Sequence, residues 1–299
     1  MAITVWPITE GFAAEIGDVD LSRALAADEV AAIKQAFWDY GVLIFPAQNL
    51  TEQQHVDFAC HIGPIEISIA ALNSDAPQRI RTDLADVSNL NPRNEIWGEK
   101  SRRRALGVGN RLWHTDSSFK FLPARASLLY ARSIPPIGGH TEFADMRAAY
   151  DALDQDMKDR LAGLIAEHAL SYSRERTGFT SFTERERNNL PPVPQMVVRT
   201  IPENGRRSLY IASHIGRIRG LGEDDACALI DRLIAHATQR QFVYTHRWRT
   251  GDLVMWDDRC TMHRGTEYDD LRWPRDMHRA TVSDIANTCE QAGIAVAAA

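Results

Sequence analysis

The chain has 299 residues, of which 44% are hydrophobic and 25% charged, a balance typical of globular proteins. Its formal net charge of −6 gives no general electrostatic reason to bind nucleic acid or an anionic membrane. The four cysteines form no C-x-x-C pair, which argues against a zinc cluster and a disulfide framework. The N-terminus lacks a signal-peptide pattern, and no apolar run is long enough to span a bilayer, so we expect a cytoplasmic protein.

The N-terminal region predicts helix, strand and helix in that order. Apolar residues at helical spacing predict a helix over 28–40, and Gly41 follows it as a stop signal. The apolar run 42–45 predicts a short buried strand. Thr51-Glu-Gln-Gln54 is typical of a capping box, so a second helix is expected up to about Cys60.

Two segments are polar, irregular and long. Residues 68–111 are rich in Asn, Asp and Arg, and residues 177–194 hold three prolines and many charges. A long irregular segment inside a compact domain is usually functional or disordered. Since the first segment runs directly into the motif at 113–119, we expect both to be lid or insert loops. The alternative is an ordinary mobile surface loop.

The rest of the chain predicts many short strands. Helices are expected over 146–153, 156–168 and 223–238, and strands over 126–133, 196–200, 208–212, 242–248, 252–256 and 277–282. Because strands and helices do not alternate, a mostly β fold with flanking helices is favoured, built on an antiparallel jelly-roll core. No repeat or linker is visible, so one domain over 1–299 is expected.

The strongest chemical signal is the pair His114 and Asp116 in Trp-His-Thr-Asp-Ser-Ser-Phe, with His263 far downstream. Two imidazoles and one carboxylate can cap one face of a six-coordinate metal, as in non-heme Fe(II) oxygenases. On a strand, residues i and i+2 point to one side, so His114 and Asp116 would share the metal while Thr115 faces away. His263 lies 263 − 116 = 147 residues later, so only the tertiary fold can add it.

Further polar residues strengthen this interpretation, because each motif alone is common by chance. Thr141 follows a glycine turn, where its hydroxyl could donate to a carboxylate. Arg275 and Arg279 are four residues apart, so on one strand they face the same side, with His278 on the opposite side. Two inward arginines are costly to bury unpaired, which points to two anionic ligands in one pocket. The alternative is two surface arginines on an edge strand.

With these residues in place, a family resemblance is visible along nearly the whole chain. It is carried by the stretches 110–119, 139–153, 237–248 and 251–265. The chain resembles the Fe(II)/2-oxoglutarate-dependent dioxygenases of the taurine dioxygenase group. Within that group it is most similar to the 2,4-dichlorophenoxyacetate (aryloxyalkanoate) dioxygenases. The resemblance implies a double-stranded β-helix (jelly-roll) fold and a homo-oligomer.

The resemblance also implies roles for individual residues. The iron ligands would be His114, Asp116 and His263. Thr141 and Arg275 would bind the distal carboxylate of the co-substrate 2-oxoglutarate, and Asn110 would lie near its metal-bound end. Arg279 would take the carboxylate of the substrate, and His214 matches a pocket histidine of the phenoxyacetate enzymes.

The implied reaction uses O₂ to hydroxylate the carbon next to the ether oxygen of an aryloxyalkanoic acid. The products would be a phenol, a 2-oxo acid, succinate and CO₂. One departure stands out: phenoxyacetate-cleaving members carry a lysine in the segment matching 66–72, and here that segment has none.

Three alternatives stay open at this point. A related dioxygenase acting on a sulfonate, a sulfate ester or another small organic acid would explain the missing lysine. A zinc hydrolase could use the same three ligands, but the 2-oxoglutarate residues would then have no purpose. A non-catalytic jelly-roll binding module would not need a complete metal triad.

Overall fold

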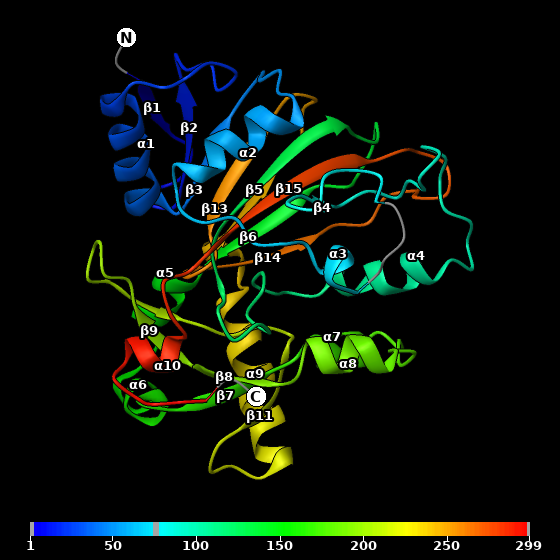
Figure 1. Cartoon of the computed structure of the whole chain (residues 1–299). Coiled ribbons are helices and arrows are strands. Elements are labelled where there is room, and N and C mark those ends of the chain that lie inside the picture. The colour runs from blue at the N-terminus through cyan, green and yellow to red at the C-terminus, as the bar shows by residue number, and fades with distance from the viewer. Residues whose placement is uncertain (1–2, 74–77, 298–299) are drawn as a thin grey trace.

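A seven-stranded sheet dominates one half of the molecule (Figure 1). The computed structural model describes residues 3–73 and 78–297. Within them the sheet has the order β1-β2-β3-β13-β5-β15-β4, and its neighbours are antiparallel except for the parallel pair β2 and β3. The strands are β1 (Thr4–Pro7), β2 (Ala13–Gly17), β3 (Val42–Phe45), β4 (Ala85–Asp86), β5 (Ala124–Ser133), β13 (Leu253–Asp257) and β15 (Asp276–Ser283).

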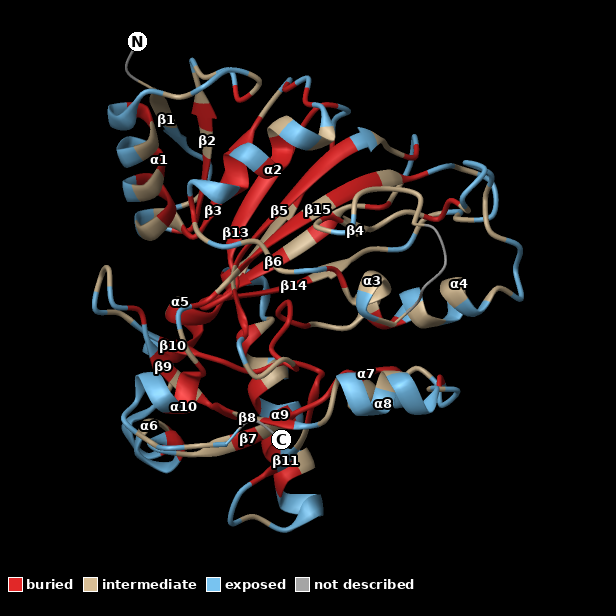
Figure 2. Cartoon of the chain, in the orientation of Figure 1, coloured by how far each residue is buried: buried red, intermediate tan, exposed pale blue. Residues whose placement is uncertain are grey.

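A three-stranded sheet packs on one face of the large sheet. It consists of β12 (Val243–His246), β6 (Thr141–Asp145) and β14 (Thr261–Gly265), with β6 in the centre. Val42 and Ile44 of β3 join Phe143 of β6 and Trp256 of β13 in one buried cluster. The strand interiors are buried on both faces (Figure 2), as the apolar run 42–45 requires.

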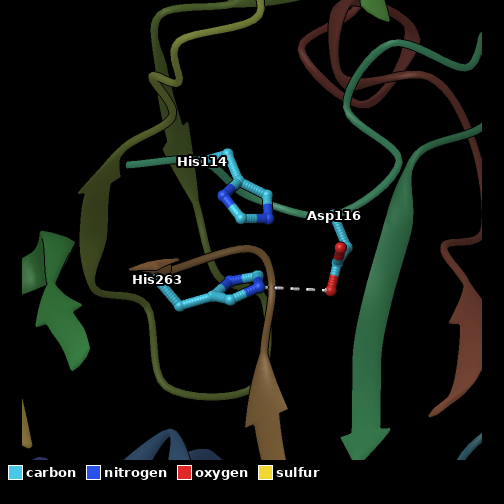
Figure 3. A group of neighbouring side chains, drawn as sticks. All are labelled: His114, Asp116 and His263. Atoms are coloured by element: carbon cyan, nitrogen blue, oxygen red, sulfur yellow. Dashed lines mark ion pairs between the residues drawn. The ribbon is translucent and has the colours of Figure 1, made fainter. Parts of the chain in front are cut away.

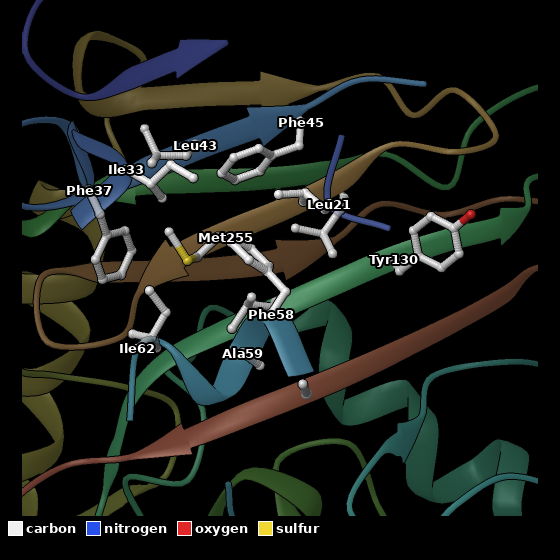
Figure 4. Close-up of a cluster of buried hydrophobic side chains, with 14 of the residues drawn as sticks. Leu21, Ile33, Phe37, Leu43, Phe45, Phe58, Ala59, Ile62, Tyr130 and Met255 are labelled. Atoms are coloured by element: carbon white, nitrogen blue, oxygen red, sulfur yellow. The ribbon is translucent and has the colours of Figure 1, made fainter. Parts of the chain in front are cut away.

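The other face of the large sheet is covered by two helices. Leu43 and Phe45 pack there with residues of α1 (Ala27–Tyr40) and α2 (Glu52–Cys60), as Figure 4 shows. Gly41 ends α1 with a positive φ of 87°, and Thr51 caps α2 through the backbone N–H of Gln54. The helix, strand and helix predicted over 28–60 are therefore confirmed, because each is encoded by local signals, whereas the strands β1 and β2 that precede them were not predicted.

A second body lies beyond the three-stranded sheet. It holds β7 (Ile165–His168), β8 (Val193–Met196), β9 (Val198–Thr200), β10 (Arg207–Leu209), β11 (Ile215–Ile218), α5 (Met146–Asp151), α6 (Gln155–Leu161), α9 (Glu223–Ala237), the 3₁₀ turn η2 (Arg240–Phe242) and α10 (Thr288–Gln291). The helix predicted over 156–168 is wrong beyond Leu161. Gly163 has a φ of 75° and reverses the chain, and the last residues form β7 instead.

The two predicted lid segments meet at one side of the molecule. The first, of which residues 74–77 lie outside the described part, holds α3 (Ile69–Asn73), β4, α4 (Arg102–Gly107) and the 3₁₀ turn η1 (Val108–Arg111). The second holds α8 (Glu184–Asn189), which lies beside α7 (Leu170–Glu175) and below α3 and α4 in Figure 1. Asn189 donates to the Leu72 carbonyl (3.1 Å), and Arg102 pairs with Glu186 (2.7 Å). Both segments therefore have more regular structure than the sequence predicts.

The described helices include none that could cross a lipid bilayer, because none is both long and apolar enough.

Candidate metal centre

The backbone itself brings the two distant histidines together. His114 and His263 face each other in an isolated antiparallel bridge, with N–H to carbonyl distances of 3.0 and 2.7 Å. Asp116 follows in a turn, where Ser117 has a φ of 50°. Their side chains converge in Figure 3, and one donor atom from each lies within 4.8 Å of the others. This confirms the convergence that the motifs predict.

The local geometry differs from the expected strand. Of the residues 113–116, only His114 pairs with another strand, and the chain turns directly after it. Thr115 nevertheless points away from the group, since its hydroxyl donates to the Asp258 carbonyl at 2.7 Å. The turn, rather than strand alternation, therefore places Asp116 beside the imidazoles.

Both histidines are held in the neutral form that metals bind. Burial lowers the pKa of His114 to about 4 and that of His263 well below its usual value. His114 Nδ1 donates to the Leu112 carbonyl at 2.7 Å, which leaves the Nε2 lone pair for a ligand. His263 Nε2 lies 3.7 Å from Asp116 Oδ2, so one ion could contact both.

Asp116 is fixed by contacts on both carboxylate oxygens. Arg279 donates to Oδ1, and Ser127 Oγ lies 2.8 Å from Oδ2. Burial opposes ionisation, but the charge of Arg279 and the two histidines lower the pKa of Asp116 to about 2. The carboxylate is therefore charged, the form that binds a cation.

A second buried acid stands behind Asp116. Ser127 Oγ is 2.8 Å from Asp258 Oδ2 as well, yet a hydroxyl carries one proton. Burial and the charge of Asp116 raise the pKa of Asp258 well above its usual value. Ser127 Oγ therefore lies between the two carboxyl groups, within hydrogen-bond distance of each, and the raised pKa favours the uncharged form of Asp258 beside the charged Asp116. Neither Ser127 nor Asp258 was expected from the sequence, although Asp258 belongs to the motif that contains His263.

The centre opens on a cavity of about 500 Å³. His114, Asp116, Arg279 and His214 line it together with apolar side chains from the first lid segment. His214 Nδ1 meets the Ser173 hydroxyl at 2.9 Å, whereas Nε2 is buried without a partner among the described residues. The fold thus brings both predicted substrate-binding residues, Arg279 and His214, to the cavity. Nη1 of Arg279 donates to Asp116.

A smaller cavity of about 200 Å³ is lined by two of the residues predicted to bind 2-oxoglutarate. Asn110 and Arg275 line it, and Arg275 Nε is buried without a partner among the described residues. Burial lowers the pKa of Arg275 to about 10. Thr141 does not line this cavity, but it pairs in register with Gly265, which does. The hydroxyl of Thr141 accepts a hydrogen bond from Trp248 Nε1 at 3.0 Å. His278 faces the other side of β15, 3.5 Å from Glu52 of α2, as predicted.

Comparison with known proteins agrees with this geometry. Residues 4–281 match the family described as "Taurine catabolism dioxygenase TauD, TfdA family". The chain belongs to this TauD/TfdA family. It is similar to the alpha-ketoglutarate-dependent 2,4-dichlorophenoxyacetate dioxygenase of Cupriavidus pinatubonensis, with 42% identity over 96% of this chain and 99% of the relative. The (S)-phenoxypropionate/alpha-ketoglutarate-dioxygenase of Sphingobium herbicidovorans is 37% identical over 79% of this chain and 80% of its own.

A solved structure of the TauD/TfdA type has the same fold. The crystal structure of AAD-2 in complex with Mn(II) and N-oxalylglycine superposes with a TM-score of 0.88, at 42% identity over 96% of this chain and 99% of the other. This chain is accordingly a non-heme Fe(II)- and 2-oxoglutarate-dependent dioxygenase. The donor set fits the iron, since two neutral imidazoles and one charged carboxylate converge with an open cavity on one side.

Proposed function

We propose that this dioxygenase hydroxylates the carbon next to the ether oxygen of an aryloxyalkanoic acid such as 2,4-dichlorophenoxyacetate. One observation carries the proposal: the metal centre opens on a cavity of about 500 Å³ whose lining combines arginines and a set of apolar side chains with acidic residues that each pair with a lysine or an arginine. Ile69, Leu84, Trp97 and Phe119 belong to that apolar lining. An aromatic acid has matching chemistry at its two ends.

Each residue is assigned a role on that basis. The iron ligands are His114, Asp116 and His263. Asn110, Thr141 and Arg275 hold 2-oxoglutarate, which the unpaired and buried Nε of Arg275 supports. Arg279 and His214 bind the carboxylate of the substrate, since both line the larger cavity.

The chemistry divides between the bound groups and the protein. When bound, iron and 2-oxoglutarate supply oxidising power: O₂ is consumed, 2-oxoglutarate becomes succinate and CO₂, and one oxygen atom enters the substrate C–H bond. The chain's own residues hold the substrate carboxylate, so that the carbon beside the ether oxygen faces the metal. The hydroxylated carbon is a hemiacetal, which collapses to a phenol and a 2-oxo acid, glyoxylate in the case of an oxyacetate.

The architecture is consistent with this function. We interpret the two facing sheets as the halves of a double-stranded β-helix, or jelly roll, within one domain over 1–299. Segments 68–111 and 177–194 act as its lid, because residues of both line the larger cavity. A cytoplasmic location and a homo-oligomeric state remain predictions.

One observation favours a second substrate class, a sulfonate, a sulfate ester or another small organic acid. Segment 66–72 has no lysine, and Glu66 of this segment lines the larger cavity. Lys120 reaches the segment from another part of the chain, but its Nζ forms an ion pair with Glu66 Oε2 at 3.0 Å. The cavity therefore presents a paired glutamate at this segment, and no free lysine comes from it.

The test is to incubate the Fe(II)-loaded protein with 2-oxoglutarate, O₂ and 2,4-dichlorophenoxyacetate, and to measure phenol and succinate. The expected result is equal amounts of both, absent when the acid is left out. Succinate without phenol would contradict ether cleavage and direct attention to sulfonates and sulfate esters. Neither product in iron-loaded protein would contradict the whole assignment.

A further inference from the structure

Arg174, for which the sequence suggests no role, lies at the junction of the two cavities. It belongs to α7, is only 8% exposed and lines both cavities. Nη1 donates to Ser173 Oγ at 3.0 Å and Nη2 donates to Asn110 Oδ1 at 2.9 Å. Nε is buried with no partner among the described residues. Every partner of this cation is therefore neutral.

The other buried arginines differ from Arg174 in this respect. Arg147, Arg199 and Arg259 each pair with a nearby aspartate. Arg275 has no acidic partner among the described residues, but the proposed function already gives it the co-substrate carboxylate. An isolated buried cation is costly unless a ligand or partner neutralises it. Arg174 is thus a buried charge for which no anion is yet assigned.

The acidic residues of the larger cavity cannot supply that anion. Each of those described already contacts a lysine or another arginine. Asp116 in particular is paired with Arg279, so these two charges offset each other. Burial lowers the pKa of Arg174 to about 10, which still leaves it charged at neutral pH.

The guanidinium is also held firmly. A Cβ added to Gly109 in η1 would lie 2.4 Å from Arg174 Nη1 and 2.5 Å from its Cδ, so the side chain lies directly on this backbone. Ser173 Oγ contacts both Arg174 and His214 Nδ1. The arginine and the histidine therefore form one preorganised wall of the larger cavity.

We propose that Arg174 binds the carboxylate of the substrate together with Arg279 and His214, and that Arg279 also holds the metal ligand Asp116. This inference rests on the proposed function, since it takes the substrate to be a carboxylic acid. It adds a specificity-determining residue on α7 to the groups on β15. It also explains how the amide of Asn110 is oriented: its oxygen accepts a hydrogen bond from Arg174, which leaves its nitrogen to donate to the co-substrate.

The test compares binding of 2,4-dichlorophenoxyacetate and its primary amide to the anaerobic Fe(II)·2-oxoglutarate enzyme by calorimetry, so that no turnover is needed. Arg174→Gln should weaken the acid about 10- to 100-fold, the range for losing charge-assisted hydrogen bonds, and should change the amide much less. The acid affinity of Arg174→Lys should lie between those of the unmodified enzyme and of Arg174→Gln, because lysine keeps the charge but lacks the planar guanidinium. Affinity for 2-oxoglutarate should fall much less than affinity for the acid, since Arg174 touches the co-substrate site only through Asn110 Oδ1.

Three further variants control this result. Arg176→Gln removes an arginine two residues along that pairs with Asp231 and lines neither cavity, and should change nothing. Gly109→Ala keeps Arg174 but displaces it, and should also lower the acid-to-amide ratio. Arg279→Gln should lower both the iron affinity and this ratio, because Arg279 contacts Asp116 and lines the same cavity, whereas Arg174→Gln should lower the ratio alone.

Equal losses for acid and amide in Arg174→Gln, or a loss of 2-oxoglutarate affinity instead, would overturn the proposal. If Arg174→Gln does not fold, Gly109→Ala decides, and an unchanged ratio there would refute it. Failure of the unmodified enzyme to bind or cleave the aryloxyacetate would instead count against the proposed function. Arg174 is then tested in the same way with whichever acid stimulates succinate formation.

Discussion

The two cavities share part of their lining, including Asn110 and Arg174, but differ in the elements that complete them. The smaller one combines residues of the first lid segment with residues at strand ends, Gly265 of β14 and Arg275 just before β15. The larger one is enclosed mainly by α3, the loops around β4, and the α7–α8 region. Strand ends in a packed sheet are rigid, whereas loops and short helices vary and move. The smaller cavity therefore has one wall on the sheets, whereas the larger one depends mainly on loops and short helices and is the more adaptable of the two.

The largest expected effect comes from breaking the metal centre, two of whose ligands line the larger cavity. Asp116→Ala removes the anionic ligand, so iron affinity and succinate formation should fall by more than about 100-fold, beyond the range for lost outer contacts of a metal ligand. Metal analysis after dialysis and a succinate assay measure the two quantities. Asp231→Ala, which removes an exposed carboxylate, serves as the control. Undiminished turnover in Asp116→Ala would refute the metal assignment.

An intermediate effect should separate the two cavities. Arg275→Gln removes a buried cation from the smaller one, so binding of 2-oxoglutarate should weaken about 10- to 100-fold, as charge-assisted hydrogen bonds are worth about 1.5–3 kcal/mol. The affinity for the aryloxy acid should not change. Isothermal titration of the Fe(II) protein with each ligand measures both. Arg272→Gln, an exposed arginine in the same connection, is the matched control. Weaker substrate binding alone would mean that the cavities have been assigned the wrong way round.

The smallest effect should come from the contact between the lid segments. Asn189→Ala removes hydrogen bonds to Leu72 O and Asn73 Oδ1, worth up to about 1 kcal/mol, so the substrate KM should rise about 2- to 5-fold. Hydrogen exchange should become faster in α3, while the co-substrate KM stays constant. Asn204→Ala loses a comparable bond to Trp38 O far from the lid and provides the comparison. Equal KM changes for both ligands would show that the lid does not serve the larger cavity alone.

Local sequence signals predicted much of the fold and of the centre. The helices α1 and α2 follow from spacing, a glycine stop and a capping box. His114 and Asp116 are close in sequence, so any compact turn or strand keeps their side chains near each other. The helix expected over 156–168 was wrong in its second half, because the pairing of β7 with β8 and β11 outweighs local preference there.

What the sequence determined by itself is the chemistry on offer: two imidazoles, a carboxylate and several arginines at spacings that suit a metal and anionic ligands. Only the tertiary structure decided which of those charges remain available. Arg279 is offset by Asp116 across 163 residues, whereas Arg174, to which the sequence pattern gives no role, is buried against Gly109. The reason is physical, since the strength of a charge depends on burial and on partners, and both are set by contacts between residues far apart in the chain.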